Sequence, residues 1–105
     1  MDRIETLLRL YEDDPMDPFT LFALGYEHLN QGNVERALHW YESICRVAPE
    51  YTGVYYHLGR LYARLGRKDS ALQTFREGIA VCRKVRQTKD LSELQQALTE
   101  LEDDE

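Results

Sequence analysis

The sequence predicts an all-α protein built from antiparallel helix pairs, and an internal repeat is the main evidence. The dipeptide Leu24–Gly25 returns as Leu58–Gly59, 34 residues later. A fixed period of this length is typical of a stacked two-helix unit, and Gly or Pro separates the segments with helical spacing. The same shift aligns five further pairs of residues: Leu21 with Tyr55, Gly32 with Gly66, Ala37 with Ala71, Leu38 with Leu72, and Tyr41 with Phe75.

At these positions the chain resembles the tetratricopeptide repeat (TPR) family, whose unit is a helix–turn–helix of this length. The resemblance implies a TPR-type α-solenoid with one full repeat at residues 18–51 and a second at residues 52–85. The first repeat departs from the family pattern at His28, which is usually Tyr, and at Ile44, which is usually Ala. The second departs at Arg83, where Pro usually ends the helix, so this helix is expected to continue beyond residue 83.

Small residues in each repeat are expected to let its two helices approach closely. Gly25 should face Ala37 where the helices of the first repeat cross, and Gly59 should face Ala71 in the second. Larger side chains then fill the space on either side of the crossings: Leu24, Tyr41, Leu58 and Phe75. The alternative is an unrelated helical bundle whose residue spacing matches by accident.

An N-terminal helix is predicted within residues 1–14, where apolar residues such as Ile4 and Leu7 recur at helical spacing. It should end at Asp14, because the residue before a proline avoids the α region. Pro15 lies 34 residues before Pro49, which closes the first repeat. This segment is therefore interpreted as the second helix of a truncated preceding repeat.

The first full repeat is expected to form helices at about residues 18–31 and 34–47. Asp17 is a suitable N-cap, and Pro18 suits the first helical position because its missing N–H would be unpaired there anyway. Gly32 suits the turn, where the end of a helix often requires a positive φ.

The second repeat is expected to form helices near residues 52–65 and 68–86, with Gly66 in the turn between them. Boundaries predicted in this way carry an error of about two to four residues.

A C-terminal capping helix is predicted at residues 90–103. Asp90 and Glu93 have the spacing of a capping box, with Asp in place of Ser or Thr. Gln95 replaces the Gly of the helix crossing in the family frame. A terminal helix with a polar outer face keeps an open stack soluble, and the apolar face here is formed by Leu91, Leu94, Leu98 and Leu101.

Length and composition are typical of one globular domain, so we expect residues 1–105 to form a single domain. We also expect the protein to be cytoplasmic. The net charge is −6, which disfavours binding to a phosphate backbone. No apolar run is long enough to span a membrane, and the N-terminal segment does not resemble a signal peptide. We therefore expect no nucleic-acid or membrane partner. Cys45 and Cys82 are interpreted as reduced packing residues rather than a disulfide or redox pair.

The sequence lacks the motifs that carry chemistry. It contains no Gly-rich phosphate loop, no Gly-x-Ser-x-Gly and no Cys-x-x-Cys. His28, His39 and His57 each lack a His or Cys three or four residues away, and His28 is expected to pack in or beside the core. We predict no catalytic residue, no metal site and no cofactor.

A peptide-binding groove is the functional site that the resemblance implies, because the first helix of each TPR lines a concave surface. Tyr56, Arg60 and Arg64 share one helix face by their spacing. Aromatic residues and Arg are enriched at binding hot spots, so a partner with apolar anchors and a carboxylate is expected. The residues carried over from the family are Phe19, Phe22, Tyr26 and Asn30 in the first repeat, and Tyr56, Arg60 and Arg64 in the second.

Two alternatives remain open at this point. Phe19 and Phe22 could pack against the N-terminal helix, while the two arginines pair with Glu27 or a neighbouring acid. The groove or the exposed ends could also pair with a second copy, which would make the protein a self-associating scaffold. Some TPR domains hold C-terminal carboxylates through Lys and Asn at groove positions, but Phe22 and Tyr26 occupy the relevant slots here.

Overall fold

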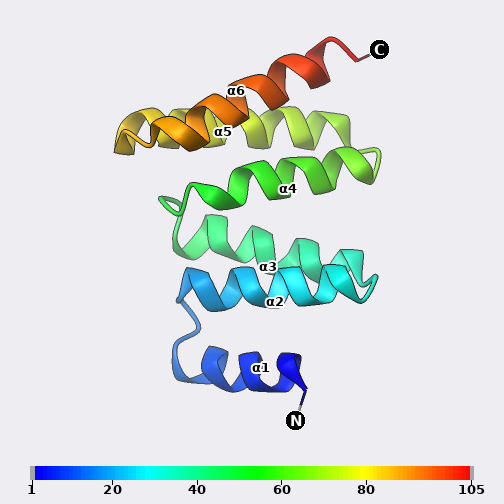
Figure 1. Ribbon diagram of the computed structural model, residues 1–105, viewed down its shortest axis with the longest axis vertical. Helices are drawn as coiled ribbons and strands as arrows, with labels where there is room; N and C mark the ends of the chain where they lie inside the picture. The colour runs from blue at the N-terminus through cyan, green and yellow to red at the C-terminus, as the bar shows by residue number, and fades with distance from the viewer. Residues whose placement is uncertain (1, 105) are drawn as a thin grey trace. The chain divides into compact units, whose positions relative to one another are not determined.

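The computed structural model describes residues 2–104, and over these residues it contains six α-helices and no strand. The all-α prediction is confirmed (Figure 1). Across the described residues, no helix combines the length and the apolar character needed to cross a membrane. The helices are α1 (Arg3–Asp13), α2 (Pro18–Asn30), α3 (Val34–Val47), α4 (Gly53–Arg64), α5 (Lys68–Val85) and α6 (Thr88–Glu102).

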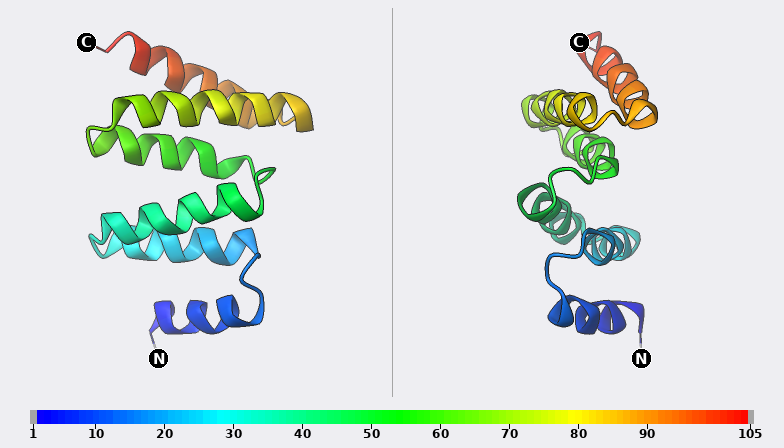
Figure 2. Two further views of the ribbon diagram at one scale, coloured as in Figure 1. Left: turned by 180° about the vertical axis from the view of Figure 1, so that it is seen from behind. Right: turned by 90° about the vertical axis from the view of Figure 1, so that its left-hand side faces the viewer.

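The chain divides into two compact units, and the division falls between Tyr51 and Thr52. The N-terminal unit contains α1, α2 and α3, and the C-terminal unit contains α4, α5 and α6. Within each unit, successive helices run antiparallel, as the left view in Figure 2 shows.

The start of α2 follows the predicted capping. The backbone N–H of Phe19 donates to an Asp17 carboxylate oxygen at 3.2 Å, and the Thr20 hydroxyl donates to the other oxygen at 2.8 Å. Pro18 is the first helical residue, and α1 ends at Asp13, one residue before the Asp14–Pro15 pair. Local sequence chemistry therefore sets the α1–α2 connection.

Gly32 and Gly66 end α2 and α4 as predicted, with φ values of 79° and 78°. Each allows the following N–H to reach back to a carbonyl of the last helical turn: Asn33 to His28 at 2.8 Å, and Arg67 to Tyr62 at 2.9 Å. Arg86 occupies the same left-handed position after α5, with φ 63°. The helix α5 thus continues past Arg83 to Val85, which confirms the expected extension.

In the N-terminal unit, Gly25 makes room for an aromatic ring. A Cβ built on Gly25 would lie 2.5 Å from a ring carbon of Tyr41, so the ring of this α3 residue packs directly on the α2 backbone. The atoms nearest to Gly25 therefore belong to Tyr41, although Ala37 was predicted to face it; Ala37 is itself fully buried. A large ring covers more apolar area than the methyl group of Ala37 would.

The C-terminal unit repeats this arrangement and adds a second crossing. A Cβ on Gly59 would lie 2.3 Å from the Phe75 ring. A Cβ on Gly78 would lie 2.5 Å from Tyr55 and 2.9 Å from Leu94, so this glycine admits side chains from both α4 and α6. Leu94 is fully buried, whereas the other leucines of its helix are at least partly exposed.

The start of α6 corrects one prediction. The helix begins at Thr88, two residues before the predicted start, and its N-cap residue Gln87 makes no side-chain capping bond. Asp90 is therefore not the cap. It lies in the first turn of α6, where its carboxylate accepts a hydrogen bond from the Thr52 hydroxyl.

Neither cysteine forms a disulfide within the described chain. Cys82 is fully buried, and its burial, with a smaller effect of the Asp90 charge, raises the pKa of the thiol. Cys45 is half-buried. A buried thiol of raised pKa is a poor nucleophile, which is consistent with the packing role predicted for Cys82.

Candidate functional site

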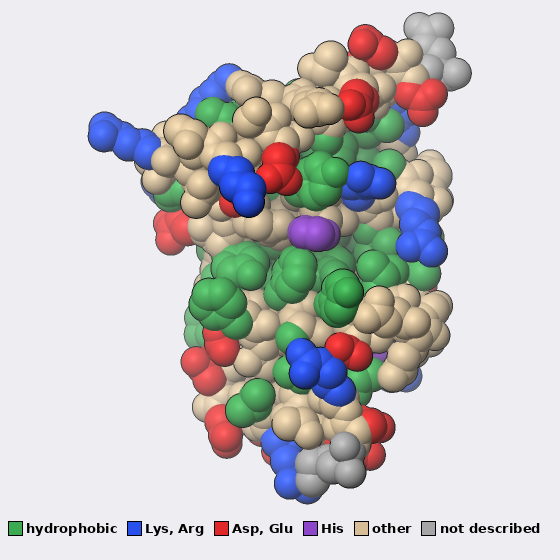
Figure 3. Space-filling model, viewed as in Figure 1, with side chains coloured by type: hydrophobic (Ala, Val, Ile, Leu, Met, Phe, Trp, Pro, Cys, Tyr) green, Lys and Arg blue, Asp and Glu red, His purple; other side chains and the backbone are tan. Residues whose placement is uncertain are grey.

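The predicted residues of the first repeat share one exposed side of α2, which we call the α2 aromatic face (Phe19, Phe22 and Tyr26). Phe19 is 71% exposed and Tyr26 is 53% exposed, while Phe22 is half-buried. Asn30, at the end of α2, is exposed as well. Figure 3 shows hydrophobic side chains gathered on this side of the N-terminal unit.

Tyr51 extends this face, although it is not among the residues predicted from the sequence. Its ring lies edge-on to Phe19 at 5.4 Å between centroids, and 6.2 Å from the Phe22 ring. The groove positions carried over from the TPR family lie only on the first helix of each repeat, whereas Tyr51 follows the second helix of the first repeat. The available signal was an aromatic residue two positions after the closing Pro49, within reach of the start of α2.

Contacts inside the unit hold the aromatic face in place. The Phe22 ring also lies 5.2 Å from the Tyr41 ring, which rests on Gly25. Burial, with a smaller contribution from Tyr26, raises the pKa of Tyr41 to about 12, so its hydroxyl stays neutral at physiological pH. The face is therefore supported from below by a neutral tyrosine of the core.

The predicted residues of the second repeat form the α4 Tyr–Arg face (Tyr56, Arg60 and Arg64). The Arg60 guanidinium donates to the Tyr56 hydroxyl at 2.8 Å, and its central carbon lies 5.5 Å from the Tyr56 ring centroid. Arg60 and Arg64 are exposed and Tyr56 is half-buried. The one-face spacing predicted from the sequence thus brings Arg60 onto Tyr56, where it is held by a hydrogen bond and a cation–π contact.

The structure decides part of the packing alternative. Glu27 pairs with Arg3 of α1 at 2.7 Å, so Glu27 is engaged within the N-terminal unit. The ring contacts of Phe19 and Phe22 involve Tyr51 and Tyr41, on the α3 side of the unit. The phenyl ring of Phe19 nevertheless remains mostly exposed.

The histidines do not assemble a site for chemistry. His28 is buried, as expected, and burial followed by the charge of Arg36 lowers its pKa. His39 and His57 are exposed on α3 and α4. Among residues 2–104, no three His, Cys, Asp or Glu side chains come together as a metal site would require.

Known proteins resemble this chain over the segment that contains the internal repeat. Residues 22–83, more than half of the chain, match the sequence profile described as Tetratricopeptide repeat. The TPR repeat-containing protein YpiA of Bacillus subtilis (strain 168) is 34% identical over 67 residues, which are 64% of this chain and 16% of the relative. The chain thus spans less than a fifth of that relative.

Two solved structures share the arrangement of helices. The crystal structure of a tetratricopeptide repeat domain protein from Salinibacter ruber is 49% identical, and the match covers 85% of this chain and 99% of that one with a TM-score of 0.80. PcrH, solved in complex with the chaperone binding region of PopD, is 18% identical and gives a TM-score of 0.82 over 93% of this chain and 74% of that one. At that lower identity the similarity shows the fold alone.

Proposed function

Because the chain belongs to the tetratricopeptide repeat family, whose domains generally serve as protein–protein interaction modules, we propose that it is a non-catalytic module that binds a peptide or helix of a partner protein. In this proposal, residues 18–51 and 52–85 are the two repeats of a single domain. The α2 aromatic face and the α4 Tyr–Arg face supply the contacts. The capture of a PopD segment by PcrH, which shares the fold, supports a peptide as the ligand class.

The exposure of Phe19 is the observation that carries the proposal. A phenyl ring that is 71% exposed leaves apolar area in water, and it contacts the Tyr51 ring edge-on at 5.4 Å between centroids. An aromatic side chain has only two rotatable χ angles, so it loses little conformational entropy when a ligand covers it. Phe19 and Tyr26 are therefore suited to anchor apolar side chains of a partner.

The α4 Tyr–Arg face selects for charge. The Arg60 guanidinium donates one hydrogen bond to the Tyr56 hydroxyl and lies over the Tyr56 ring. Its other N–H groups remain available for a carboxylate. Arg64 lies one turn further along the same side of α4. A partner segment that binds this face is thus expected to carry at least one acidic residue.

The test begins with affinity capture from the native cell, followed by titration of the captured partner segment. Arg60→Glu/Arg64→Glu should weaken binding by about a hundredfold, because two charge-assisted contacts become repulsive. Phe19→Ser/Tyr26→Ser should weaken binding by about tenfold or more through the loss of buried apolar area. Each pair reports on one face alone.

Arg9→Glu is the matched control, because Arg9 is an exposed arginine of α1 outside both faces. It changes the net charge by the same amount per residue and should leave the affinity nearly unaltered. Undiminished affinity in both face variants would rule out these surfaces as the binding site.

Self-association is the second candidate, and exposed apolar residues of α1 favour it. Leu8 is 37% exposed and Leu10 is 49% exposed. A second copy that covered these side chains would remove apolar area from water. A concentration series in light scattering decides between the two functions: a constant monomer mass excludes strong self-assembly, whereas a mass that rises and is lowered by Leu10→Ser favours it.

A further inference from the structure

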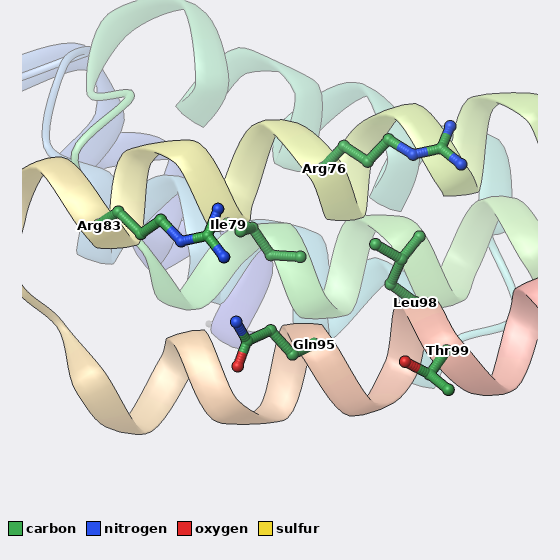
Figure 4. Close-up of a pocket in the computed structure, with 6 residues that line it drawn as sticks. All are labelled: Arg76, Ile79, Arg83, Gln95, Leu98 and Thr99. Carbon is green, nitrogen blue, oxygen red and sulfur yellow. The ribbon is translucent and has the colours of Figure 1, made fainter.

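A groove of about 480 Å³ runs between α5 and α6 of the C-terminal unit, and its lining includes no residue of the two faces described above. Ile79 is buried and Leu98 is half-buried, so the middle of the groove is apolar. Figure 4 shows Arg83 and Gln95 extending toward each other at one end, while Arg76 lies at the other. The lining residues are Arg76, Ile79 and Arg83 of α5, and Gln95, Leu98 and Thr99 of α6.

The two ends of the groove differ in their charge balance. At one end, the Arg76 guanidinium donates to a carboxylate oxygen of Glu102 at 3.1 Å. Arg83 follows Arg76 by seven residues on α5, and Gln95 precedes Glu102 by seven residues on α6. Seven residues are about two helical turns, and the helices run antiparallel, so Arg83 and Gln95 stand in the same relation as the first pair. A neutral amide thus occupies the position of the carboxylate.

Nearby acidic side chains on the same helices have other partners. Asp90 accepts the Thr52 hydrogen bond. Glu93 lies close enough to His57 of α4 for its charge to oppose the desolvation that lowers the pKa of that imidazole. Glu77 accepts a hydrogen bond from Gln73. Within residues 2–104, Arg83 has no ion-pair partner, and its positive charge remains uncompensated.

The end of α5, the turn that follows it and the start of α6 add to this positive charge. Lys84, Arg86 and Lys89 are all exposed and lie within six residues of Arg83 in the sequence. The chain as a whole carries a net charge of −6, so this end of the α5–α6 pair is a local reversal of sign. A cationic end beside an apolar strip is complementary to an acidic, leucine-containing segment.

We propose that this groove is a second docking site, which binds an acidic segment of a partner protein. One carboxylate of the segment accepts hydrogen bonds from the Arg83 guanidinium and the Gln95 amide, and so fills the position that Glu102 fills beside Arg76. An aliphatic side chain of the same segment covers Ile79 and Leu98. The Arg83–Gln95 end selects for charge, and the apolar strip fixes the register of the segment.

Fluorescence anisotropy with the full chain tests the site, using a short labelled peptide of alternating glutamate and leucine as the probe. Arg83→Gln should weaken binding by about tenfold or more, because a charge-assisted hydrogen bond is lost. Gln95→Glu should weaken it similarly, because the new carboxylate neutralises Arg83 and repels the peptide. Probes with glutamine for glutamate, or alanine for leucine, should each bind more weakly than the parent peptide.

Arg9→Gln is the matched control, since it removes one exposed positive charge from the N-terminal unit. Both Arg83 and Gln95 are exposed, so their variants should fold, and circular dichroism confirms this. Equal affinity of the Arg83→Gln and Arg9→Gln variants would overturn the proposal. Undiminished affinity of the Gln95→Glu variant, or of the glutamine probe, would also overturn it.

Two further measurements identify a different occupant. Inorganic phosphate and the unlabelled peptide with alanine for leucine are compared as competitors for the labelled probe. If phosphate displaces the probe as effectively as that peptide does, the groove is a simple anion site and the peptide proposal is wrong. If sedimentation shows a dimer that Arg83→Gln dissociates, a second copy is the occupant instead. Methyl shifts of Ile79 and Leu98 on addition of the probe, without dimer formation, support the proposal.

Discussion

The Thr52 hydroxyl donates a hydrogen bond of 2.6 Å to the Asp90 carboxylate, which joins the start of α4 to the first turn of α6. Thr52 is buried and Asp90 is half-buried, so water reaches the pair poorly. Thr52 is also the N-cap residue of α4 but makes no capping bond there. Its hydroxyl therefore stabilises the position of α6 rather than the helix that it begins.

Replacing Thr52 by Val should lower the free energy of unfolding by about 1–2 kcal/mol, because a hydrogen bond to a charged group is lost while the shape is kept. Thr52→Ser, which retains the hydroxyl, is the control and should lose less. The midpoint of urea unfolding measures both variants. Equal midpoints for the valine and serine variants would mean that the hydroxyl contributes nothing.

Gly59→Ala should destabilise the protein at the Gly59–Phe75 crossing, although helix propensity alone predicts that it would stabilise it. Alanine is favoured over glycine in a helix by about 1 kcal/mol. The methyl group of Gly59→Ala, however, would lie 2.3 Å from the Phe75 ring, and such overpacking typically costs about 1–3 kcal/mol. We expect a net loss of stability in urea unfolding. The loss should shrink in a Phe75→Leu background, and a stabilised single variant would contradict the crossing.

Ala71 gives a second test of the same packing. It is fully buried on α5, so Ala71→Leu should cost about 1–3 kcal/mol through overpacking. Ala80 lies on the same helix and is exposed, so Ala80→Leu is the matched control and should change little. The thermal midpoints of the two variants are compared; the same midpoint for both would show that the site tolerates the larger side chain.

The helices were predictable because the repeat fixes both their faces and their turns. Residues 34–47 were predicted and observed as α3, and the glycines at 32 and 66 have the expected positive φ. Asp90 was misassigned because its partner, Thr52, lies 38 residues away in the sequence, whereas a capping box is a local pattern. Long-range contacts of this kind leave no periodic signal in one sequence.

The candidate site was predictable only in part. The family frame placed Phe19, Tyr26 and Arg60 on helix surfaces, and all three are exposed. It could not find Tyr51, which follows a different helix, or the contact of Arg60 with Tyr56, which depends on side-chain conformation. Whether these surfaces bind a partner stays a prediction.

Arg86 adopts a backbone conformation that disfavours side chains. Its φ is 63°, and the left-handed region costs an L-residue roughly 1–2 kcal/mol. Arg86→Gly should therefore raise the free energy of unfolding by about 1 kcal/mol. Gly66→Ala is the mirror experiment and should lower it by a similar amount, because no neighbouring atom within 4 Å adds a clash. A destabilised Arg86→Gly variant would show that the arginine side chain contributes more than the strain removes.

His28 should make stability depend on pH. It is buried, its Nδ1 has no hydrogen-bond partner among the described residues, and burial followed by the charge of Arg36 lowers its pKa from 6.5. Below pH 6.5 the unfolded chain takes up a proton before the native chain does. The contribution of His28 to stability should therefore be constant above this value, fall as the pH drops below it, and level off below the native pKa.

His57 contributes in the same direction. Its side chain reaches solvent, but partial desolvation by its surroundings lowers its pKa despite the opposing charge of Glu93. The two residues are separated by measuring urea unfolding at several pH values for His28→Phe and for His57→Gln. His28→Phe should remove part of the loss below pH 6.5, since it leaves no group to protonate in the core. If His28→Phe keeps the full pH dependence of the parent chain, His28 is protonated equally well in both states and its burial carries no electrostatic penalty.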